Sequence, residues 1–354
     1  MNRRLAALLV APLLSFSTSS RAGNDLCPDV PGGPPGMLAR DLPEAAIRRA
    51  HTMGGTTLDL GASGVDCETA TKAYTEVFAA FDRLEKLTAS SGEGSQLAAI
   101  NAAAGKEAVA VDPELFALIQ LALGFAKLTD GAFDPTFAAL EGLWSFGEGG
   151  APPSDEEIEA RKKLVDWKKV VLDEDKRTVM LQEPGMKLGL GGIVKGYAID
   201  KAVEILERHK VPHFLIRSGA EVYVKGNPGG GFRRIGVPDP RGSGSFALLD
   251  VRDRALNTSS DNVKFFLKGG VRYHHIIDAR TGRPASRSRT VSVVAVDATS
   301  ADALSTALFV LGPEKGLPLV EKLAGVEAIV VDDKNVVHLS SGISDRLELK
   351  APTP

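Results

Sequence analysis

The irregular order of strand-like and helix-like segments is the feature of this sequence that most constrains its fold. Short β-branched runs and longer amphipathic segments are interspersed over 354 residues. No segment recurs at a fixed period, and no regular strand–helix–strand rhythm is visible. A doubly wound parallel sheet needs that rhythm, so the order favours the α+β class.

Hydrophobic periodicity and capping residues predict the individual elements. Apolar residues recur at three- and four-residue spacing from Ala70 to Leu87 and predict a helix at 68–87. Further helices are predicted at 115–128, 151–160, 196–209, 301–311 and 315–323. Strands are predicted at 214–216, 221–224, 233–237, 246–251, 272–277 and 290–296. Two hairpins are predicted, 165–172 with 178–181 and 328–331 with 336–339.

Composition excludes several classes of protein. Hydrophobic residues make up 44% and charged residues 25%, as in proteins with a packed core. A net charge of -3 gives no reason to expect nucleic-acid binding or a charge-driven membrane partner. No apolar run reaches the roughly 18 residues of a transmembrane helix. The two cysteines are too few for a disulfide framework or a cysteine-based zinc site.

The first residues have the pattern of a secretory signal. A positive start at Arg3 and Arg4 precedes an apolar stretch at 5–16, and residues 20–22 offer a small-x-small cleavage site. Pro12 argues against the alternative of a buried N-terminal helix. We expect a signal peptide at 1–22 and a Pro/Gly-rich lead at 23–45.

The two cysteines bear on the same question of export. Cys27 does not directly follow the apolar run, which disfavours a lipid anchor there. In an oxidising compartment Cys27 and Cys67 are the only possible disulfide pair, and two buried thiols are equally compatible with the sequence.

A glycine cluster at 189–196 leads into the predicted helix at 196–209. Exposed backbone N–H groups and the positive end of a helix suit a phosphate group. The cluster matches neither common nucleotide fingerprint, so a tight turn is the stronger interpretation. Lys195 favours the phosphate-site interpretation, because a lysine in such a turn can neutralise an anion.

Asp302 and Thr306 are four residues apart and share one face of the predicted helix at 301–311. Their oxygens are ligands of the kind that Mg²⁺ accepts. The alternative, which is stronger without further context, is capping by Ser300 with Asp302 complementing the helix dipole.

Two histidines stand in the strand-like run at 272–277. Alternation places His274 and His275 on opposite faces, so one is expected to be buried and the other accessible. A neutral imidazole can act as a general base. The turn at 278–284 carries arginines that suit either phosphate oxygens or solvent. Small polar residues at 257–261 and 130–136 are interpreted as turns or a helix start.

Seven motifs in order resemble those of the ApbE-type FAD:protein FMN transferases. They are DGAFDPT (130–136), LWSFG (143–147), LGGIVKGYAID (190–200), PDP (238–240), NTSSD (257–261), HHIIDARTGRP (274–284) and ADALSTALFVLG (301–312). The likeness runs from about Met53 to Gly342. It implies an α+β fold with mixed or antiparallel sheets and packed helices. A single large domain would then span 46–345, followed by a tail at 346–354.

The resemblance implies an exported, periplasmic enzyme that uses Mg²⁺ and takes FAD as its substrate, with the outer face of the cytoplasmic membrane as an alternative location. Such an enzyme cleaves the FAD pyrophosphate, attaches FMN to a Thr or Ser of a redox protein and releases AMP. Membrane association would be indirect or, less favoured, through a lipid anchor.

The resemblance also implies site residues. Asp302, Thr306 and the backbone carbonyl of Gly192 match the metal ligands, and His275 matches the histidine that helps to deprotonate the acceptor. FAD contacts are implied for Met53, Ala132, Phe133, Asp134, Lys195, Thr258, Ser259 and Ile277.

Three positions depart from the family pattern. Gly189 stands where an Asp is common, Ser91 where many members have a Tyr, and Ser260 where a Gly is usual. The alternatives to a transferase are therefore an FAD pyrophosphatase that uses water and a flavin-binding accessory protein without turnover.

Overall fold

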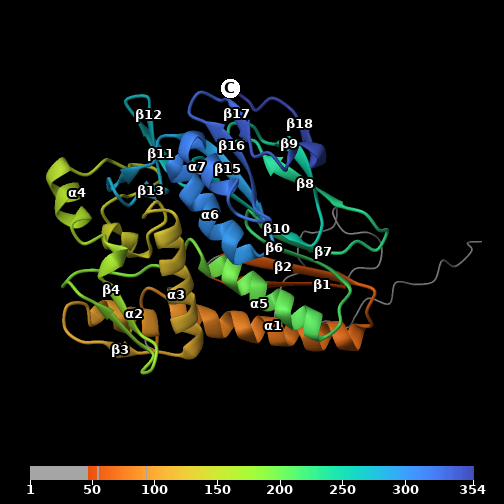
Figure 1. Ribbon diagram of the computed structural model, residues 1–354, viewed down its shortest axis with the longest axis horizontal. Coiled ribbons are helices and arrows are strands. Elements are labelled where there is room, and N and C mark those ends of the chain that lie inside the picture. The colour runs from red at the N-terminus through yellow and green to blue at the C-terminus, as the bar shows by residue number, and fades with distance from the viewer. Residues whose placement is uncertain (1–46, 54–55, 93) are drawn as a thin grey trace, which may run out of the picture.

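The computed structural model describes residues 47–53, 56–92 and 94–354, and the predicted signal peptide (1–22) and lead (23–45) lie outside the described residues (Figure 1). An eight-stranded sheet with the strand order β1-β2-β6-β7-β10-β15-β16-β17 forms the central layer. Every neighbouring pair in it is antiparallel. The predicted α+β class with antiparallel sheets is confirmed.

The helices are α1 (Cys67–Thr88), α2 (Gln96–Ala102), α3 (Pro113–Leu128), α4 (Asp155–Lys162), α5 (Val194–Arg208), α6 (Ala298–Leu311) and α7 (Pro313–Val320), with 3-10 turns η1 (Pro135–Leu140), η2 (Trp167–Lys169) and η3 (Ser344–Arg346). The strands of the large sheet are β1 (Ile47–Met53), β2 (Thr56–Ser63), β6 (His213–Ser218), β7 (Glu221–Lys225), β10 (Arg254–Ser260), β15 (Ser288–Ala295), β16 (Glu327–Asp332) and β17 (Val337–Leu339). The smaller sheets contain β3 (Val109–Ala110), β4 (Val170–Asp173), β5 (Thr178–Leu181), β8 (Arg233–Pro238), β9 (Ser245–Val251), β11 (Phe265–Lys268), β12 (Val271–His274), β13 (Ile277–Asp278), β14 (Arg283–Pro284) and β18 (Leu347–Leu349).

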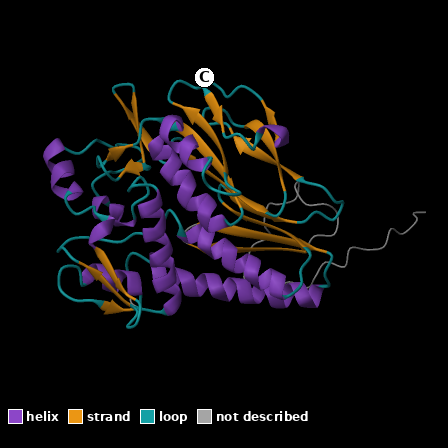
Figure 2. Cartoon of the chain, viewed as in Figure 1, coloured by secondary structure: helices purple, strands orange, loops and turns teal. Residues whose placement is uncertain are grey.

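Alternation along the central strands produces three layers. In β6, Phe214 and Ile216 pack against the helices, whereas Leu215 packs against the sheet of β8, β9 and β18. The strands β7, β10, β15 and β16 divide their apolar residues in the same way. Helices α1, α5 and α6 cross one face of the large sheet (Figures 1 and 2). The middle of the sheet is therefore buried on both faces.

The helix predictions hold where caps and apolar periodicity agree. Asp66 caps α1 by accepting from the Thr69 N–H at 2.8 Å, and Asp112 caps α3, which has Pro113 in its first turn. The helix predicted at 151–160 begins instead at Asp155, because Ser154 and Glu157 form the capping box after two prolines. The helix predicted at 315–323 lies at 313–320.

The interpretation of residues 257–261 as a turn or helix start is wrong. Most of this segment belongs to β10, which pairs with β7 on one side and β15 on the other. The polar side chains of this central strand are stable because other buried polar groups form hydrogen bonds with them, as Asp302 does with Asn257. The strand predicted at 272–277 is also wrong in its length, since it ends at His274 and restarts at Ile277.

Two further observations concern the described residues. No helix among them combines the length and the apolar character that crossing a membrane requires. Cys67 is held in a disulfide. Cys27, the other cysteine of the sequence, lies outside the described residues.

Candidate functional site

Helix α6 carries both predicted side-chain metal ligands. Asp297 begins the helix by accepting from the Ser300 N–H at 2.7 Å and the Ser300 hydroxyl at 2.9 Å. The expectation that Ser300 caps this helix is therefore wrong, because Ser300 donates to the cap. Of the residues of α6, only Ser300 and Thr306 are not buried. Thr306 is thus the accessible position in the middle of an otherwise buried helix.

Asp302 is 2% exposed and bound by groups from two other segments. Its Oδ2 accepts from the Gly196 N–H at 3.2 Å, and its Oδ1 accepts from the Asn257 side-chain amide at 2.8 Å. The Lys195 Nζ lies 3.6 Å from Oδ1. These partners hold the Asp302 carboxylate where α5, β10 and α6 meet, in addition to any interaction with the dipole of α6.

The glycine cluster is a turn that enters α5. The Ile193 and Val194 N–H groups both donate to the Leu190 carbonyl, and the helix starts at Val194 without a side-chain cap. A Cβ at Gly196 would lie 2.3 Å from the Ala298 carbonyl oxygen. The glycine is therefore what lets α5 approach α6 closely enough for its N–H to reach Asp302.

Gly192 lies beside two other predicted site residues. A Cβ at this position would be 3.7 Å from the Thr306 Oγ1 and 3.2 Å from a ring carbon of Phe133. Gly192, Thr306 and Phe133 come from three segments that are far apart in the sequence. The structure thus brings the predicted metal and FAD positions together.

Lys195 and Glu221 complete the charged part of this region. The carboxylate of Asp302 raises the pKa of Lys195, so its ammonium is charged at neutral pH. Glu221, at the start of β7, is 0% exposed, and neither of its oxygens has a hydrogen-bond partner among the described residues. Burial, followed by the charge of Asp302, raises the pKa of Glu221 well above its usual value. Reasoning from the sequence missed Glu221, because an acid in a strand carries no local signal.

The polar residues of β10 divide between the two faces of the sheet. Asn257 and Ser259 face α6, where the Ser259 Oγ lies 2.8 Å from the Ser305 Oγ. Thr258 faces the other layer, with its Oγ1 2.7 Å from the Ser292 Oγ. The Ser259 side chain therefore lies beside α6, whereas the Thr258 side chain lies on the other face of the sheet. Asn257 was missed, although a period of two along this segment would have found it.

The segment before η1 supplies Ala132, Phe133 and Asp134, all of them buried. The Asp134 Oδ1 accepts from the Thr136 N–H at 2.8 Å and from its hydroxyl at 2.6 Å, and Oδ2 accepts from the Trp167 N–H at 3.3 Å. Burial raises the pKa of Asp134. Its side chain is therefore occupied in holding the turn that enters η1.

The two histidines have different environments, as predicted. His274 is buried, with its Nε2 2.8 Å from the Ala285 carbonyl oxygen and its ring edge-on to Phe309 of α6. His275 is half-buried, and its Nδ1 lies 3.3 Å from the Lys264 carbonyl oxygen. Burial lowers the pKa of His275 to about 4, and the charge of Lys195 acts in the same direction. The imidazole of His275 is therefore neutral at neutral pH.

The remaining predicted positions lie at the margins of this region. Ile277 packs beside the small apolar cluster of Trp144, Ile158 and Phe266. Met53 is the last residue of β1, and its side chain lies outside the described part. In the turn at 278–284, Arg280 pairs with Asp278 at 2.8 Å and Arg283 with Asp155 at 2.7 Å.

The structure shows the surroundings of two of the three positions that depart from the family pattern, Gly189 and Ser260, and does not explain the third. A Cβ at Gly189 would lie 2.9 Å from the Ala138 Cβ, so this position has no room for an acid. Ser260 donates to the Arg289 carbonyl at 3.2 Å. Ser91 is exposed in the loop after α1, and nothing in the structure explains it.

In the described part of the chain, no group of three or more His, Cys, Asp or Glu residues could hold a metal ion. The donor set predicted here is of another kind, because it has one carboxylate, one hydroxyl and one backbone carbonyl. Hard cations such as Mg²⁺ accept all three.

Comparison with known proteins gives one consistent result. The family model described as the ApbE family matches residues 54–330. The FAD:protein FMN transferase of Treponema pallidum is 37% identical over 78% of this chain and 82% of its own length. The protein of the same name from Klebsiella pneumoniae is 34% identical over 75% of this chain and 84% of its own.

Solved structures agree with the sequence comparisons. The ApbE protein of Thermotoga maritima superposes with a TM-score of 0.76 at 33% identity, covering 84% of this chain and 97% of that one. The flavin transferase ApbE from Vibrio cholerae gives a TM-score of 0.76 at 26% identity, covering 86% and 100%.

Proposed function

The chain belongs to the ApbE family, and we propose that it is a Mg²⁺-dependent FAD:protein FMN transferase whose acceptor is a Thr or Ser hydroxyl of a redox protein. The observation that carries the site assignment is the convergence of Asp302, Lys195 and Gly196 where α5 meets α6. The activity is the one named for its curated relatives.

The donor set of α6 and the glycine turn fits a hard cation. Asp302, Thr306 and the Gly192 carbonyl would hold Mg²⁺, because each offers oxygen and Thr306 and Gly192 are neighbours. When bound, the cation would neutralise charge on the FAD pyrophosphate and on the departing AMP.

The protein's own groups account for the rest of the reaction. Lys195 keeps its charge and is about one-third exposed, so it would bind the pyrophosphate oxygens. His275, with its neutral imidazole, would take the proton from the acceptor hydroxyl. The acceptor oxygen then forms a bond to the FMN phosphorus, while the bond from that phosphorus to the bridging oxygen breaks. AMP leaves with the bridging oxygen.

Export belongs to this proposal. The signal-like residues 1–22 would direct the protein to the periplasm, where it would meet the extracytoplasmic domains of redox proteins. Fractionation of cells that express the full chain, followed by sequencing of the mature N-terminus, tests this placement. Recovery of the uncleaved chain in the cytoplasm would contradict it.

The test of function is a reaction of the mature protein with FAD and Mg²⁺, with and without a flavin-accepting domain. AMP release and the intact mass of the acceptor are measured. A mass gain of one FMN is expected on the acceptor. AMP and free FMN without labelling of any acceptor would support the pyrophosphatase instead, and bound but unchanged FAD would support the accessory protein.

Asp302→Ala tests the metal assignment in the same assay. Turnover that depends on Mg²⁺ should be lost while the circular dichroism spectrum stays that of the folded protein. Asp175→Ala, at an exposed position between β4 and β5, is the matched control. An Asp302→Ala protein with full activity would show that the metal assignment is wrong.

A further inference from the structure

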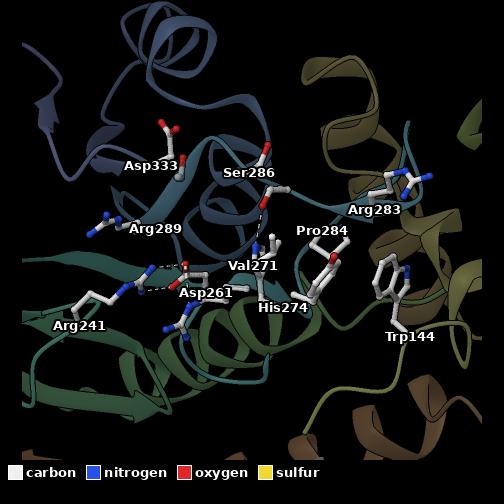
Figure 3. Close-up of a pocket in the computed structure, with 14 residues that line it drawn as sticks. Trp144, Arg241, Asp261, Val271, His274, Arg283, Pro284, Ser286, Arg289 and Asp333 are labelled. Carbon is white, nitrogen blue, oxygen red and sulfur yellow. Dashed lines mark hydrogen bonds and ion pairs between the residues drawn. The ribbon is translucent and has the colours of Figure 1, made fainter. Parts of the chain in front are cut away.

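A cavity of about 390 Å³ is lined in part by residues of β12 and β15. Its lining includes Arg241, Asp261, Arg272, His274, Ser288 and Arg289. Figure 3 shows Arg241, Asp261 and Arg289 towards one end and Trp144 and Pro284 towards the other. We call it the arginine pocket. Of the predicted site residues, none is among its lining residues.

The arginine pocket has more positive than negative charge. Arg241 forms a two-pronged pair with Asp261 at 2.6 and 2.7 Å, which uses both carboxylate oxygens. Arg272 reaches the same carboxylate only at 3.9 Å. Arg289 binds the neutral Asn335 side chain at 2.8 Å. Asp333 is a second carboxylate in the lining, and Arg283 is a fourth arginine, which pairs with Asp155 outside the lining. Four arginines of the lining therefore face two carboxylates.

Two buried polar atoms of the pocket lining have no partner. The Arg272 Nη1 and the Ser288 Oγ make no hydrogen bond within the described part of the chain. Ser288 is 4% exposed, so water does not substitute freely for a partner. Desolvation and the charge of Arg241 lower the pKa of Arg272. Both atoms are donors that an incoming carboxylate would satisfy.

Aromatic side chains line the other end of the pocket together with Arg283, and the neighbouring surface carries exposed apolar residues. The rings of Trp144 and Tyr273 stack with centroids 5.8 Å apart. Val263, just before β11, and Leu267 and Val271 of the hairpin of β11 and β12 are exposed by 67%, 63% and 52%. Exposed apolar side chains beside a charged hollow are typical of a surface that binds another protein.

The position of the pocket connects it to the reaction. His274 lines it, and the next residue is His275, the proposed base for the acceptor hydroxyl. We propose that the arginine pocket binds a carboxylate side chain of the acceptor protein, on the segment that presents the target Thr or Ser to His275. The exposed residues of β11 and β12 would contact apolar residues of the same segment. This inference rests on the proposed function, because it requires a protein acceptor.

Short synthetic peptides test the inference without knowledge of the natural acceptor. Each peptide contains one Thr among apolar residues and one Asp at a chosen distance from it, and its partner peptide has Asn in place of Asp. Binding to the mature protein is measured by calorimetry without FAD, and FMN transfer is measured by mass. We expect the best Asp peptide to bind about tenfold more tightly than its Asn partner, with the preference weakening as salt is raised.

Arg272→Gln and Arg289→Gln should each reduce this preference by about threefold, since each removes one of the two charged donors that the carboxylate would use. The KM for FAD should stay unchanged in both variants. Arg252→Gln is the matched control, because Arg252 precedes the far end of β10 and does not line the pocket. Loss of the preference in the control would contradict the assignment.

The other outcomes separate the pocket from the function. Equal binding of Asp and Asn peptides would overturn the inference, even if FMN transfer occurs. Binding of inorganic phosphate with no preference between the peptides would also overturn it, in favour of a small-anion site. A preference for Asp peptides with neither FMN transfer nor AMP release would support the carboxylate site and contradict the proposed function.

Discussion

His274 and His275 are adjacent in the sequence but differ in the contacts that their rings make. His274 is held between the Ala285 carbonyl and Phe309, so it is part of the packing. The Nε2 of His275 has no hydrogen-bond partner among the described residues, and its imidazole stays neutral because its surroundings disfavour charge. Of these two histidines, only His275 therefore has the environment that a general base needs.

The pH dependence of FMN transfer should report His275. Its pKa of about 4 means that it becomes protonated, and unable to accept a proton, only when the pH falls towards 4. The acidic limb of kcat/KM should lie near that pH rather than near the ordinary histidine value of about 6.5. A pH–rate profile of the purified enzyme measures it.

His275→Ala should remove that limb and slow transfer by about 10²- to 10⁴-fold, with a smaller effect on FAD binding. Equal losses in transfer and FAD affinity would contradict a role as base. A limb near pH 6.5 in the parent enzyme would contradict the argument from burial.

Glu141 is expected to supply the acidic contact that Gly189 lacks. Its Oε1 lies 3.6 Å from where a Cβ of residue 189 would be. Glu141→Gln should therefore weaken FAD binding several-fold, about the contribution of one charged hydrogen bond. Fluorescence titration with FAD measures this, with Glu148→Gln as the control at another exposed position. An unchanged Kd would show that Glu141 does not take that role.

At the scale of elements, the site depends on how α5 crosses α6. Gly196 permits the close approach, and Asp200 one turn later accepts from the Ala298 N–H at 2.7 Å and the Thr299 N–H at 2.8 Å. A side chain of one helix thus binds the free N–H groups at the start of the other. The distance between Lys195 and Asp302 follows from this crossing.

Asp200 makes the crossing sensitive to pH. Burial raises its pKa from 3.8 to about 6, so the folded state holds this proton more tightly than the unfolded state. Its contribution to stability is complete below about pH 4 and is lost as pH rises through 6. The loss amounts to about 3 kcal/mol for two pKa units.

Asp200→Asn should flatten this part of the stability curve, although the variant is less stable overall because it loses an acceptor. Urea unfolding at several pH values from about 4 to 7 gives the slope for parent and variant. Equal slopes in the two proteins would contradict the assignment to Asp200.

At the scale of the whole molecule, ligands and stability are linked. Mg²⁺ and FAD would bind only the folded chain, because their proposed contacts come from segments more than 100 residues apart. With Mg²⁺ present, a hundredfold excess of FAD over its Kd should add about 2.7 kcal/mol to the free energy of unfolding and so raise Tm. Thermal unfolding of the parent and of Asp302→Ala measures it. A rise in the variant equal to that of the parent would contradict binding through Asp302.

Local patterns predicted the elements well and their assembly poorly. Helices such as α1 and α3 follow from caps and periodicity, which are properties of the sequence nearby. The strand β10 does not, because Asn257 and Ser259 are stable in a central strand only through α6, more than 40 residues later. The unpartnered Glu221 was missed for the same reason, since its neighbours Lys195 and Asp302 are distant in sequence.

The near-complete burial of α6 has a consequence for how activity is lost. Amide hydrogens in such a helix exchange with solvent only when the whole structure opens. The groups around Asp302 therefore persist for as long as the molecule is folded and disperse when it unfolds. After heating, the remaining activity should therefore be proportional to the fraction of molecules that are still folded. Each folded molecule should keep its full activity.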